Sequence, residues 1–349
     1  MQRDKKKTRR SRATLKDVAD KVGVHLSTVS RVLNAKTRSM VSQDVAQRIL
    51  HAADELGYKT NPFAYALRMN RSLTVGVLIP DLTNPIFPPI IRGIEHALAK
   101  MGYTAILADS DNRAEDERVI IERMRARAVD GLILATAHRA DDVIETCVKD
   151  GIALVLINRT VDRDDISSVT SDDFDGIAQA VAHMANLGHR RIAHIAGPQS
   201  ISTGFDRYQA FKAAMRKQGL KADDKLIAFT DSFSERQGQA AVETLFKRRR
   251  KFTAVVAAND LLALGCYDAV EARGLRCPAD ISVTGFNDMP FVDKFKPPLT
   301  TVRIPLYEMG VKAAGCLLEI LSDDKQPPRR IKLTPELIVR GSTAPPKAF

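Results

Sequence analysis

The apolar and polar positions along the chain predict a short helical part followed by a long alternating part. Apolar residues recur at helical spacing over residues 15–22 after Thr14, a suitable N-cap, and Gly23 ends this helix. A second short helix is predicted over residues 26–34 and a third over residues 42–57. Two short helices joined by a tight glycine-containing turn are typical of a helix-turn-helix.

From residue 73 onward, short β-rich runs alternate with amphipathic helical stretches. Strands are predicted in eight segments, at residues 72–80, 103–110, 129–136, 152–159, 191–197, 226–232, 254–260 and 281–286. Helices are predicted between several of these segments, at residues 90–102, 115–128, 176–188 and 207–219. This alternation predicts an α/β part with parallel sheets covered by helices, arranged as two lobes.

The second predicted helix has an apolar face and an opposite face of hydrogen-bonding side chains. In a helix-turn-helix, the N-terminal residues of the second helix meet base edges in the major groove of DNA, which places Leu26 and Ser27 best for bases. Hydrogen bonds to phosphates or, for the arginine, to a guanine edge are expected from Thr28, Ser30, Arg31 and Asn34. The alternative is a solvated helix of a small bundle.

Positive charge is concentrated around this candidate DNA-binding part. Residues 1–71 hold 16 of the 53 Lys and Arg residues but 6 of the 42 Asp and Glu residues, so nearly all of the net charge of +11 lies there. Such asymmetry indicates a nucleic-acid-binding head on a near-neutral body. A solvated basic tail is the alternative, because residues 3–12 alone carry seven positive charges.

The composition narrows the possible classes of function. No apolar run is long enough to span a membrane, and none follows the basic N-terminus as in a secretory signal, so a cytoplasmic protein is expected. The four cysteines are scattered and the seven histidines lack metal-ligand spacing, which argues against disulfides and metal sites. No phosphate-binding, dinucleotide-binding or hydrolase motif is present, so neither an enzyme nor a cofactor is predicted.

The stretch TLKDVADKVGVHLSTVSRVLN, with LGY after the third helix and then NP-x-A-x-x-L, resembles the DNA-binding headpiece of the lactose-repressor family. The resemblance implies that Thr14 and the second helix contact DNA. The chain departs from the family at His25, where members usually carry a serine that caps this helix. Since histidine is a poorer N-cap, we expect His25 to contact a phosphate instead.

The segment 61–72 is too short to hold a helix alone in water. The resemblance implies a hinge helix that folds only on DNA and enters the minor groove, where Leu67 would wedge a base step and kink the duplex. Asn61 and Ala64 would contact DNA from the same hinge. Without the resemblance, a plain interdomain linker would be the better interpretation.

Motifs throughout the rest of the chain, among them IPDLTNPIF, NLGHRRIAHIAGP, SVTGFND and PPLTTVRIP, resemble the effector-binding body of the same family. The resemblance implies the type I periplasmic-binding-protein fold, two lobes hinged around a small molecule. Ligands of open parallel sheets bind outside the carboxyl ends of the strands. Among the loops that this rule selects, the resemblance implies these candidate effector-binding residues: Ile86, Phe87, Asp111, Asn158, Arg159, Thr203, Arg207, Phe233 and Asn287.

Some of these assignments have structural alternatives. Phe87 and Phe233 are alternatively core aromatics, because phenylalanine is usually buried. Asp260 is expected to cap the helix that follows it, and we leave it out of the site. Arg207 is the strongest candidate, since an arginine is seldom buried without a partner.

Two amides bear on the charge of the effector. Many sugar-binding members carry aspartate where this chain has Asn158 and Asn287. Amides at these places, beside Arg159 and Arg207, favour an acidic effector such as a sugar acid or another small organic acid. A neutral sugar remains open as the alternative.

The chain is therefore expected to comprise a basic disordered arm, a helix-turn-helix domain, a hinge helix and an effector-binding and dimerisation domain, at residues 1–12, 13–60, 61–72 and 73–349. Within the last domain, we expect lobe 1 at about residues 73–170 and 303–331. Lobe 2 is expected at about residues 171–302 and 332–342.

These parts predict a ligand-responsive transcriptional regulator, with repression as the expected sign. It would bind a pseudo-palindromic operator in double-stranded DNA as a homodimer, which the resemblance implies forms through the body. No heptad tail follows the last predicted lobe segment, so a tetramer is not expected. The alternative is a solute-binding protein of the same body fold, which would have no use for a helix-turn-helix.

Overall fold

The structure is a computed structural model that describes residues 13–34, 37–58, 71–323 and 325–347. The chain divides into two compact units, residues 1–72 and 73–349, called here the headpiece and the body. The predicted arm, most of the predicted hinge and its positions Asn61, Ala64 and Leu67 lie outside the described residues. None of the described helices is long and apolar enough to cross a membrane.

The described residues of the headpiece form three short helices and one 3₁₀ turn, α1 (Leu15–Val22), α2 (Leu26–Leu33), η1 (Arg38–Met40) and α3 (Gln43–Glu55). Small apolar side chains from all three helices form its core, namely Val18, Ala19, Val22, Val29, Val32, Ala46, Ile49, Ala52 and Ala53. The first two helices are joined by a turn at Gly23, whose φ of 74° suits glycine. The helix-turn-helix prediction is confirmed.

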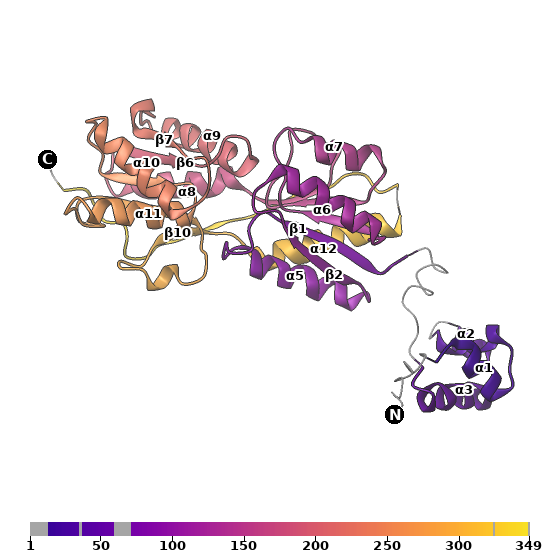
Figure 1. The fold of residues 1–349 in the computed structure, drawn as a ribbon. Coiled ribbons are helices and arrows are strands. Elements are labelled where there is room, and N and C mark those ends of the chain that lie inside the picture. Colours follow the sequence, from indigo (N-terminus) through magenta and orange to yellow (C-terminus); the bar gives the residue numbers. More distant parts are fainter. Residues whose placement is uncertain (1–12, 35–36, 59–70, 324, 348–349) are drawn as a thin grey trace, which may run out of the picture. The chain divides into compact units, whose positions relative to one another are not determined.

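The body consists of two α/β lobes, each built on a six-stranded sheet (Figure 1). The sheet of lobe 1 is parallel and has the order β11-β5-β4-β3-β1-β2, with β1 (Thr74–Ile79), β2 (Thr104–Asp109), β3 (Gly131–Leu134), β4 (Leu154–Ile157), β5 (Ser168–Ser171) and β11 (Arg330–Leu333). Its helices are α5 (Phe87–Lys100), α6 (Ala114–Ala126), α7 (Asp142–Lys149) and α12 (Leu306–Ser322).

The sheet of lobe 2 has the order β12-β10-β9-β8-β6-β7, with β6 (Ile192–Ala196), β7 (Ile227–Phe229), β8 (Ala254–Ala257), β9 (Ser282–Asn287), β10 (Thr300–Arg303) and β12 (Glu336–Ile338). The helices are α8 (Asp173–Asn186), α9 (Ser202–Lys217), α10 (Glu235–Lys247) and α11 (Asp260–Glu271), and the 3₁₀ turns are η2 (Asp224–Leu226) and η3 (Val292–Lys294). Only the edge strand β12 runs antiparallel within the described part of this sheet. Parallel sheets were therefore predicted correctly, with this exception.

Helices cover each sheet in pairs. In lobe 1, α5 packs on α12, and in lobe 2, α8 packs on α9 while α10 packs on α11. Glycines allow the close approach of α5 and α12, since a Cβ at Gly310 would lie 2.1 Å from the carbonyl oxygen of Ile90. The central strands are buried on both faces, as parallel strands between two helical layers must be.

Three crossings connect the lobes. The chain leaves lobe 1 after Ser171, returns to it after Arg303, and crosses again to β12 after Leu333. Each of the eight segments predicted as strands contains a strand, and the four short strands that flank the crossings, β5, β10, β11 and β12, were not predicted. The carboxyl ends of the strands of both lobes meet at the cleft between them, which is where a ligand of such sheets binds.

Candidate effector cleft and nucleic-acid interface

Helix α2 presents its polar face to solvent. Its buried residues are Val29 and Val32, while Leu26 is 43% exposed at the first position. Of the predicted DNA contacts, Ser27 and Arg31 are exposed, and Thr28, Ser30 and Asn34 are half-buried. An exposed N-terminal turn of a recognition helix is the surface that enters a major groove.

His25 caps α2, against the expectation from sequence. Its Nδ1 accepts a hydrogen bond from the backbone N–H of Ser27 at 3.3 Å and lies 2.8 Å from the Ser27 hydroxyl. The imidazole nitrogen thus replaces the side-chain oxygen that usually satisfies this N–H. The capping imidazole also orients the Ser27 hydroxyl, a predicted base contact.

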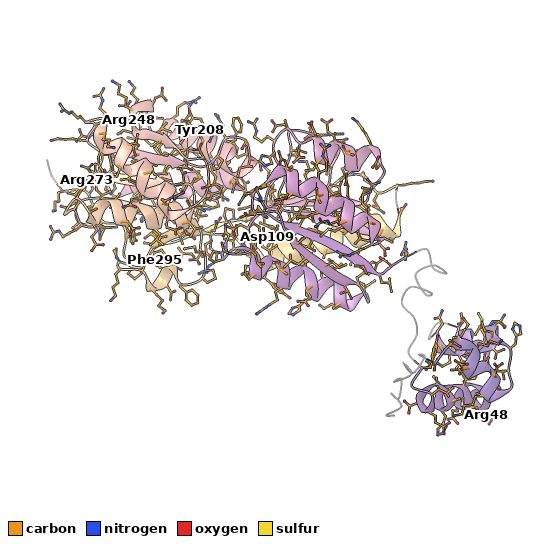
Figure 2. All side chains as sticks on the ribbon, in the orientation of Figure 1. Arg48, Asp109, Tyr208, Arg248, Arg273 and Phe295 are labelled. Atoms are coloured by element: carbon orange, nitrogen blue, oxygen red, sulfur yellow. The ribbon has the colours of Figure 1, made fainter. Side chains whose placement is uncertain are left out.

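Two arginines satisfy carbonyl groups at the ends of α1 and α2. Arg48 of α3 (labelled in Figure 2) donates from Nη2 to the carbonyl oxygen of Val22 at 3.1 Å, which satisfies the end of α1. Arg38 donates from Nε to the carbonyl oxygen of Val32 at 2.9 Å and satisfies the end of α2. Thr14 is engaged in a capping box with Asp17, whose carboxylate accepts from the Thr14 N–H at 2.7 Å.

Eight of the nine predicted effector residues line one small cavity between the lobes. This inner cavity, of about 20 Å³, is lined by Asn84, Ile86, Phe87, Asn158, Arg159, Thr203, Arg207, Phe233, Asn259 and Asn287. Asp111 is not among them: its side chain is 83% exposed and lies within 3.9 Å of Arg113. Figure 2 labels Asp109 at the end of β2, and the carboxylate of Asp109 accepts from the Asp111 N–H.

A larger outer cavity of about 220 Å³ adjoins the inner one and shares Asn84, Arg159 and Phe233 with it. Its remaining lining is mostly polar and comes from both lobes: Pro80, Asp81, Ser110, Asn112, Arg113, Glu117, Thr136, His138, Pro198, Ser200, Ile201, Asp231, Ser232 and Ser234. Most of these residues follow carboxyl ends of strands. The two cavities together form a polar cleft between the lobes.

Arg207 is held by partners from lobe 2. Its Nε lies 3.1 Å from Oδ1 of Asp173, and its Nη1 donates to the carbonyl oxygen of Ala258 at 2.8 Å. The guanidinium also lies 3.9 Å from the ring centroid of Phe286. Burial raises the pKa of Asp173 to about 6, although Arg207 opposes this shift. The charge of Arg207 is therefore already matched by a carboxyl group.

Arg159 and Glu117 form a second buried polar group in lobe 1. Arg159 donates from Nη1 to the carbonyl oxygen of Thr136 at 3.4 Å, and the Thr136 hydroxyl donates to the Glu117 carboxyl. Burial raises the pKa of Glu117 to about 7 and lowers that of Arg159 to about 10, and the attraction between the two opposes both shifts. Among the described residues, nothing accepts a hydrogen bond from the Nε of Arg159.

The two amides of interest sit on constrained backbone. Asn158 has a φ of 65° and Asn287 a φ of 116°, a region that asparagine tolerates better than most residues. Both side chains are buried, Asn158 directly after β4 of lobe 1 and Asn287 at the end of β9 of lobe 2. Within the described part of the chain, nothing donates a hydrogen bond to Oδ1 of Asn287. Strained backbone of this kind persists where the surroundings over-determine it, often at ligand sites.

The cap of α11 and two residues of the cleft differ from the predictions. Asn259, not Asp260, caps α11, since its Oδ1 accepts from the Leu262 N–H at 2.9 Å. Asp260 is fully buried and accepts from the Met289 N–H at 2.8 Å, a structural role. Asn84 and Asn259 line the inner cavity and were not predicted. Asn84 follows the predicted strand at residues 72–80, and Asn259 lies near the end of the predicted strand at residues 254–260, so both are at strand ends, where ligand contacts gather.

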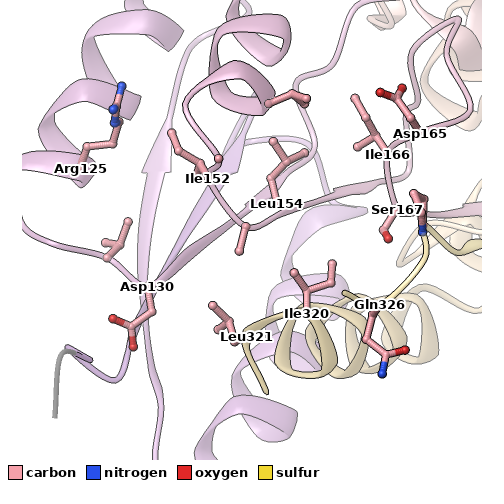
Figure 3. A pocket seen from close by; sticks show the side chains of 15 residues that line it. Arg125, Asp130, Ile152, Leu154, Asp165, Ile166, Ser167, Ile320, Leu321 and Gln326 are labelled. Carbon is pink, nitrogen blue, oxygen red and sulfur yellow. The ribbon is translucent and has the colours of Figure 1, made fainter. Parts of the chain in front are cut away.

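A larger hollow of the body lies elsewhere. It is an open surface depression of about 640 Å³ at the opposite end of the lobe 1 sheet, beside the starts of β3, β4 and β5. Figure 3 shows Arg125, Asp130, Asp165 and Gln326 around an apolar floor that includes Ile152 and Leu321. None of the predicted site residues lines it, and strand amino ends are not where such folds bind ligands.

Known proteins match both units. Residues 14–61 match the family described as bacterial regulatory proteins, lacI family, and residues 181–343 match the periplasmic binding protein-like domain. The HTH-type transcriptional regulator RegA of Clostridium saccharobutylicum is 33% identical over 95% of this chain and 99% of its own length. The chain belongs to the lacI family. It is a DNA-binding, ligand-responsive transcriptional regulator, as its two units indicated.

Two solved structures share the whole architecture of this lacI-family regulator. The lac repressor dimer bound to operator and the anti-inducer ONPF is 26% identical, with 96% of this chain and 100% of that chain covered and a TM-score of 0.83. The CelR–cellobiose complex is 31% identical, with 95% and 100% covered and a TM-score of 0.74. The family resemblance stated from the sequence is thus confirmed.

Proposed function

We propose that this lacI-family regulator is a repressor whose operator affinity is altered by a neutral, polyhydroxylated effector bound in the cleft between its lobes. The observation that carries the proposal is a set of buried polar atoms on residues of the inner cavity that, among the described residues, make no hydrogen bond: the Nε of Arg159, the Nε of Arg207 and Oδ1 of Asn287. None of the described residues accepts a hydrogen bond from the Nε of Arg159 or donates one to Oδ1 of Asn287. A bound effector would have to supply an acceptor for the first atom and a donor for the second. A hydroxyl group serves as either, whereas a carboxylate offers no donor.

The charges of the cleft favour a neutral effector over an acid. An acidic effector is favoured by Asn158 and Asn287 in place of carboxylates only if Arg159 and Arg207 lack other acidic partners. In the structure, Arg207 pairs with Asp173, and Arg159 faces Glu117. A buried anion would therefore meet two carboxyl groups as well as two guanidinium groups, which weakens the acid hypothesis.

The shape of the cleft indicates how the effector would extend. The inner cavity alone is too small for a sugar ring, so the ring would also occupy the outer cavity of about 220 Å³. Phe233 lines both cavities and offers an apolar face to a ring. The bound cellobiose of the CelR complex supports a sugar-type ligand in this fold.

The rest of the proposal follows from the two units. The regulator would act in the cytoplasm as a homodimer on a pseudo-palindromic operator, as the lac repressor dimer does on its operator. The DNA contacts would come from the headpiece residues Thr14, His25, Leu26, Ser27, Thr28, Ser30, Arg31 and Asn34. The hinge would add Asn61, Ala64 and Leu67. The proposal includes no catalytic step.

A thermal-shift titration of the full chain tests the effector class. Neutral sugars and the corresponding sugar acids would be compared at equal concentrations, with Arg207→Lys as the site variant and Asp111→Asn as the matched control outside both cavities. Arg207→Lys keeps the charge beside Asp173 but loses the planar fork of donors.

We expect one or more neutral sugars to stabilise the parent and the control by about 2.7 kcal/mol at a hundredfold excess over Kd, and not the site variant. Stabilisation by acids alone would overturn the proposed effector class. Equal stabilisation of the parent and Arg207→Lys would overturn the proposed site.

A further inference from the structure

A run of five cationic residues, 247–251, ends α10 and precedes β8. It lies at the end of the lobe 2 sheet where the parallel strands begin, opposite the carboxyl ends that form the effector cleft. Figure 2 shows Arg248 and Arg273 at the end of lobe 2 that is distant from lobe 1. The proposed effector does not contact this end of the sheet, because none of the residues here lines either cavity of the cleft. The headpiece is a separate compact unit.

The cationic run borders a groove of about 430 Å³. Its floor is apolar, with contributions from Phe246, Phe252, Leu275 and Ile281, and its rim is cationic, with Arg249, Arg250, Lys251 and Lys347. Phe246 and Leu275 are half-buried, so part of the floor is open to solvent. We call this feature the basic groove.

The backbone at Arg249 is strained where glycine would serve. Arg249 has a φ of 54° just after the end of α10, a left-handed conformation that costs a non-glycine residue about 1–2 kcal/mol. Several other helices of this chain have glycine at the equivalent position, for example Gly102 and Gly219, although Ala128 holds it after α6. A long cationic side chain is thus retained at a position where its backbone is unfavourable, which points to a role for the side chain.

The groove keeps a net positive charge. Its lining contains one carboxylate, that of Asp280, which forms ion pairs with Lys347 and Arg276. Hydrogen bonding to Lys347 lowers the pKa of Asp280 to about 2. Arg250 approaches Asp223 only at 3.9 Å. Within the described residues, no carboxylate lies within ion-pair distance of Arg249.

We propose that the basic groove docks an acidic segment of another protein, with one apolar side chain of that segment inserted over the floor. Charge complementarity selects the acidic flanks, and burial of Phe246 and Leu275 by the inserted side chain adds an apolar contribution. A nucleic-acid backbone would engage the rim alone and leave this floor uncovered. The groove therefore fits a peptide better than a duplex.

Fluorescence anisotropy with the full chain tests this proposal. The probe is a short labelled peptide of Asp and Glu residues around one central Leu, compared with the same peptide carrying Ser at the centre and with random duplex DNA. The groove variant is Arg249→Glu combined with Arg250→Glu. The matched control is Arg127→Glu combined with Lys149→Glu, two exposed cations of lobe 1.

We expect the Leu peptide to bind the parent and the control equally and the groove variant about tenfold more weakly. We also expect the Ser peptide to bind the parent about tenfold more weakly than the Leu peptide does. No binding of the Leu peptide, equal weakening by both double variants, or equal binding of the two peptides would overturn the proposal. Random DNA that loses affinity for the groove variant while the peptide does not would identify a nucleic-acid surface instead.

Discussion

Glu117 shows how burial sets the protonation of the cleft. Its carboxyl is 2% exposed and its pKa is raised to about 7 from an ordinary value of 4.5. Below pH 4.5 the group holds its proton in both the native and the unfolded state. Between pH 4.5 and about 7 only the native state holds it, so the free energy of unfolding decreases as the pH rises through this window.

This titration predicts the behaviour of Glu117→Gln. The variant cannot ionise, so its Tm minus that of the parent should become more positive between pH 5 and pH 8, with a total change in the free energy of unfolding of about 3 kcal/mol at most. Glu122→Gln, at an exposed position of the same helix, is the control and should show no such trend. A Glu117→Gln difference that is constant with pH would contradict the raised pKa.

His25 carries a second prediction at this scale. His25→Ala removes the acceptor for the Ser27 N–H and should destabilise the start of α2 by about 1 kcal/mol, whereas His25→Asn should retain a cap. Hydrogen exchange of the α2 amides in the full chain measures this directly, with roughly fivefold faster exchange expected in His25→Ala. Equal exchange in the alanine and asparagine variants would show that the cap does not stabilise the helix.

The sequence predicted side chains that act at element ends better than side chains that act through partners. Arg207, Asn158 and Asn287 could be placed because they match effector-site motifs of the lactose-repressor family, in the region where the strand ends of a parallel sheet converge. Asp173 and Glu117 could not, because each acquires its role only when a residue far along the chain folds against it. The capping rule failed at His25 because it ranks residue types and not the position of an acceptor atom.

At the scale of elements, two glycines of α12 separate close packing from helix propensity. A Cβ at Gly310 would lie 2.1 Å from the Ile90 carbonyl oxygen of α5, while a Cβ at Gly315 would meet nothing within 4 Å. Gly310→Ala should lower the free energy of unfolding by about 1–3 kcal/mol, and Gly315→Ala should raise it by up to about 1 kcal/mol. Denaturant unfolding of both variants checks this, and effects of the same sign would contradict the packing.

The same scale shows which elements a pattern can reveal. The buried strands β1, β3 and β4 read as continuous apolar runs and were predicted. Strands β5 and β11 were missed because SVTS and RIKL are short and carry polar side chains. Their pairing depends on a crossing between lobes, which no local pattern contains.

At the scale of the whole molecule, the two edges of lobe 2 have separate roles in this account. The carboxyl ends of its parallel strands form the effector cleft with lobe 1, and the basic groove lies at the end where those strands begin. Substitutions in the groove should therefore leave effector binding unchanged. The cleft, not the groove, is the part that the account links to operator binding.

Operator affinity with and without the bound sugar shows whether the cleft controls DNA binding. The operator would be selected from random duplex DNA by the full chain, and the salt concentration would be held fixed because phosphate contacts depend on it. We predict that a saturating sugar changes the operator affinity of the parent about 5–150-fold and leaves that of Arg207→Lys unchanged. A sugar that binds the parent by calorimetry yet does not alter its operator affinity would contradict the account.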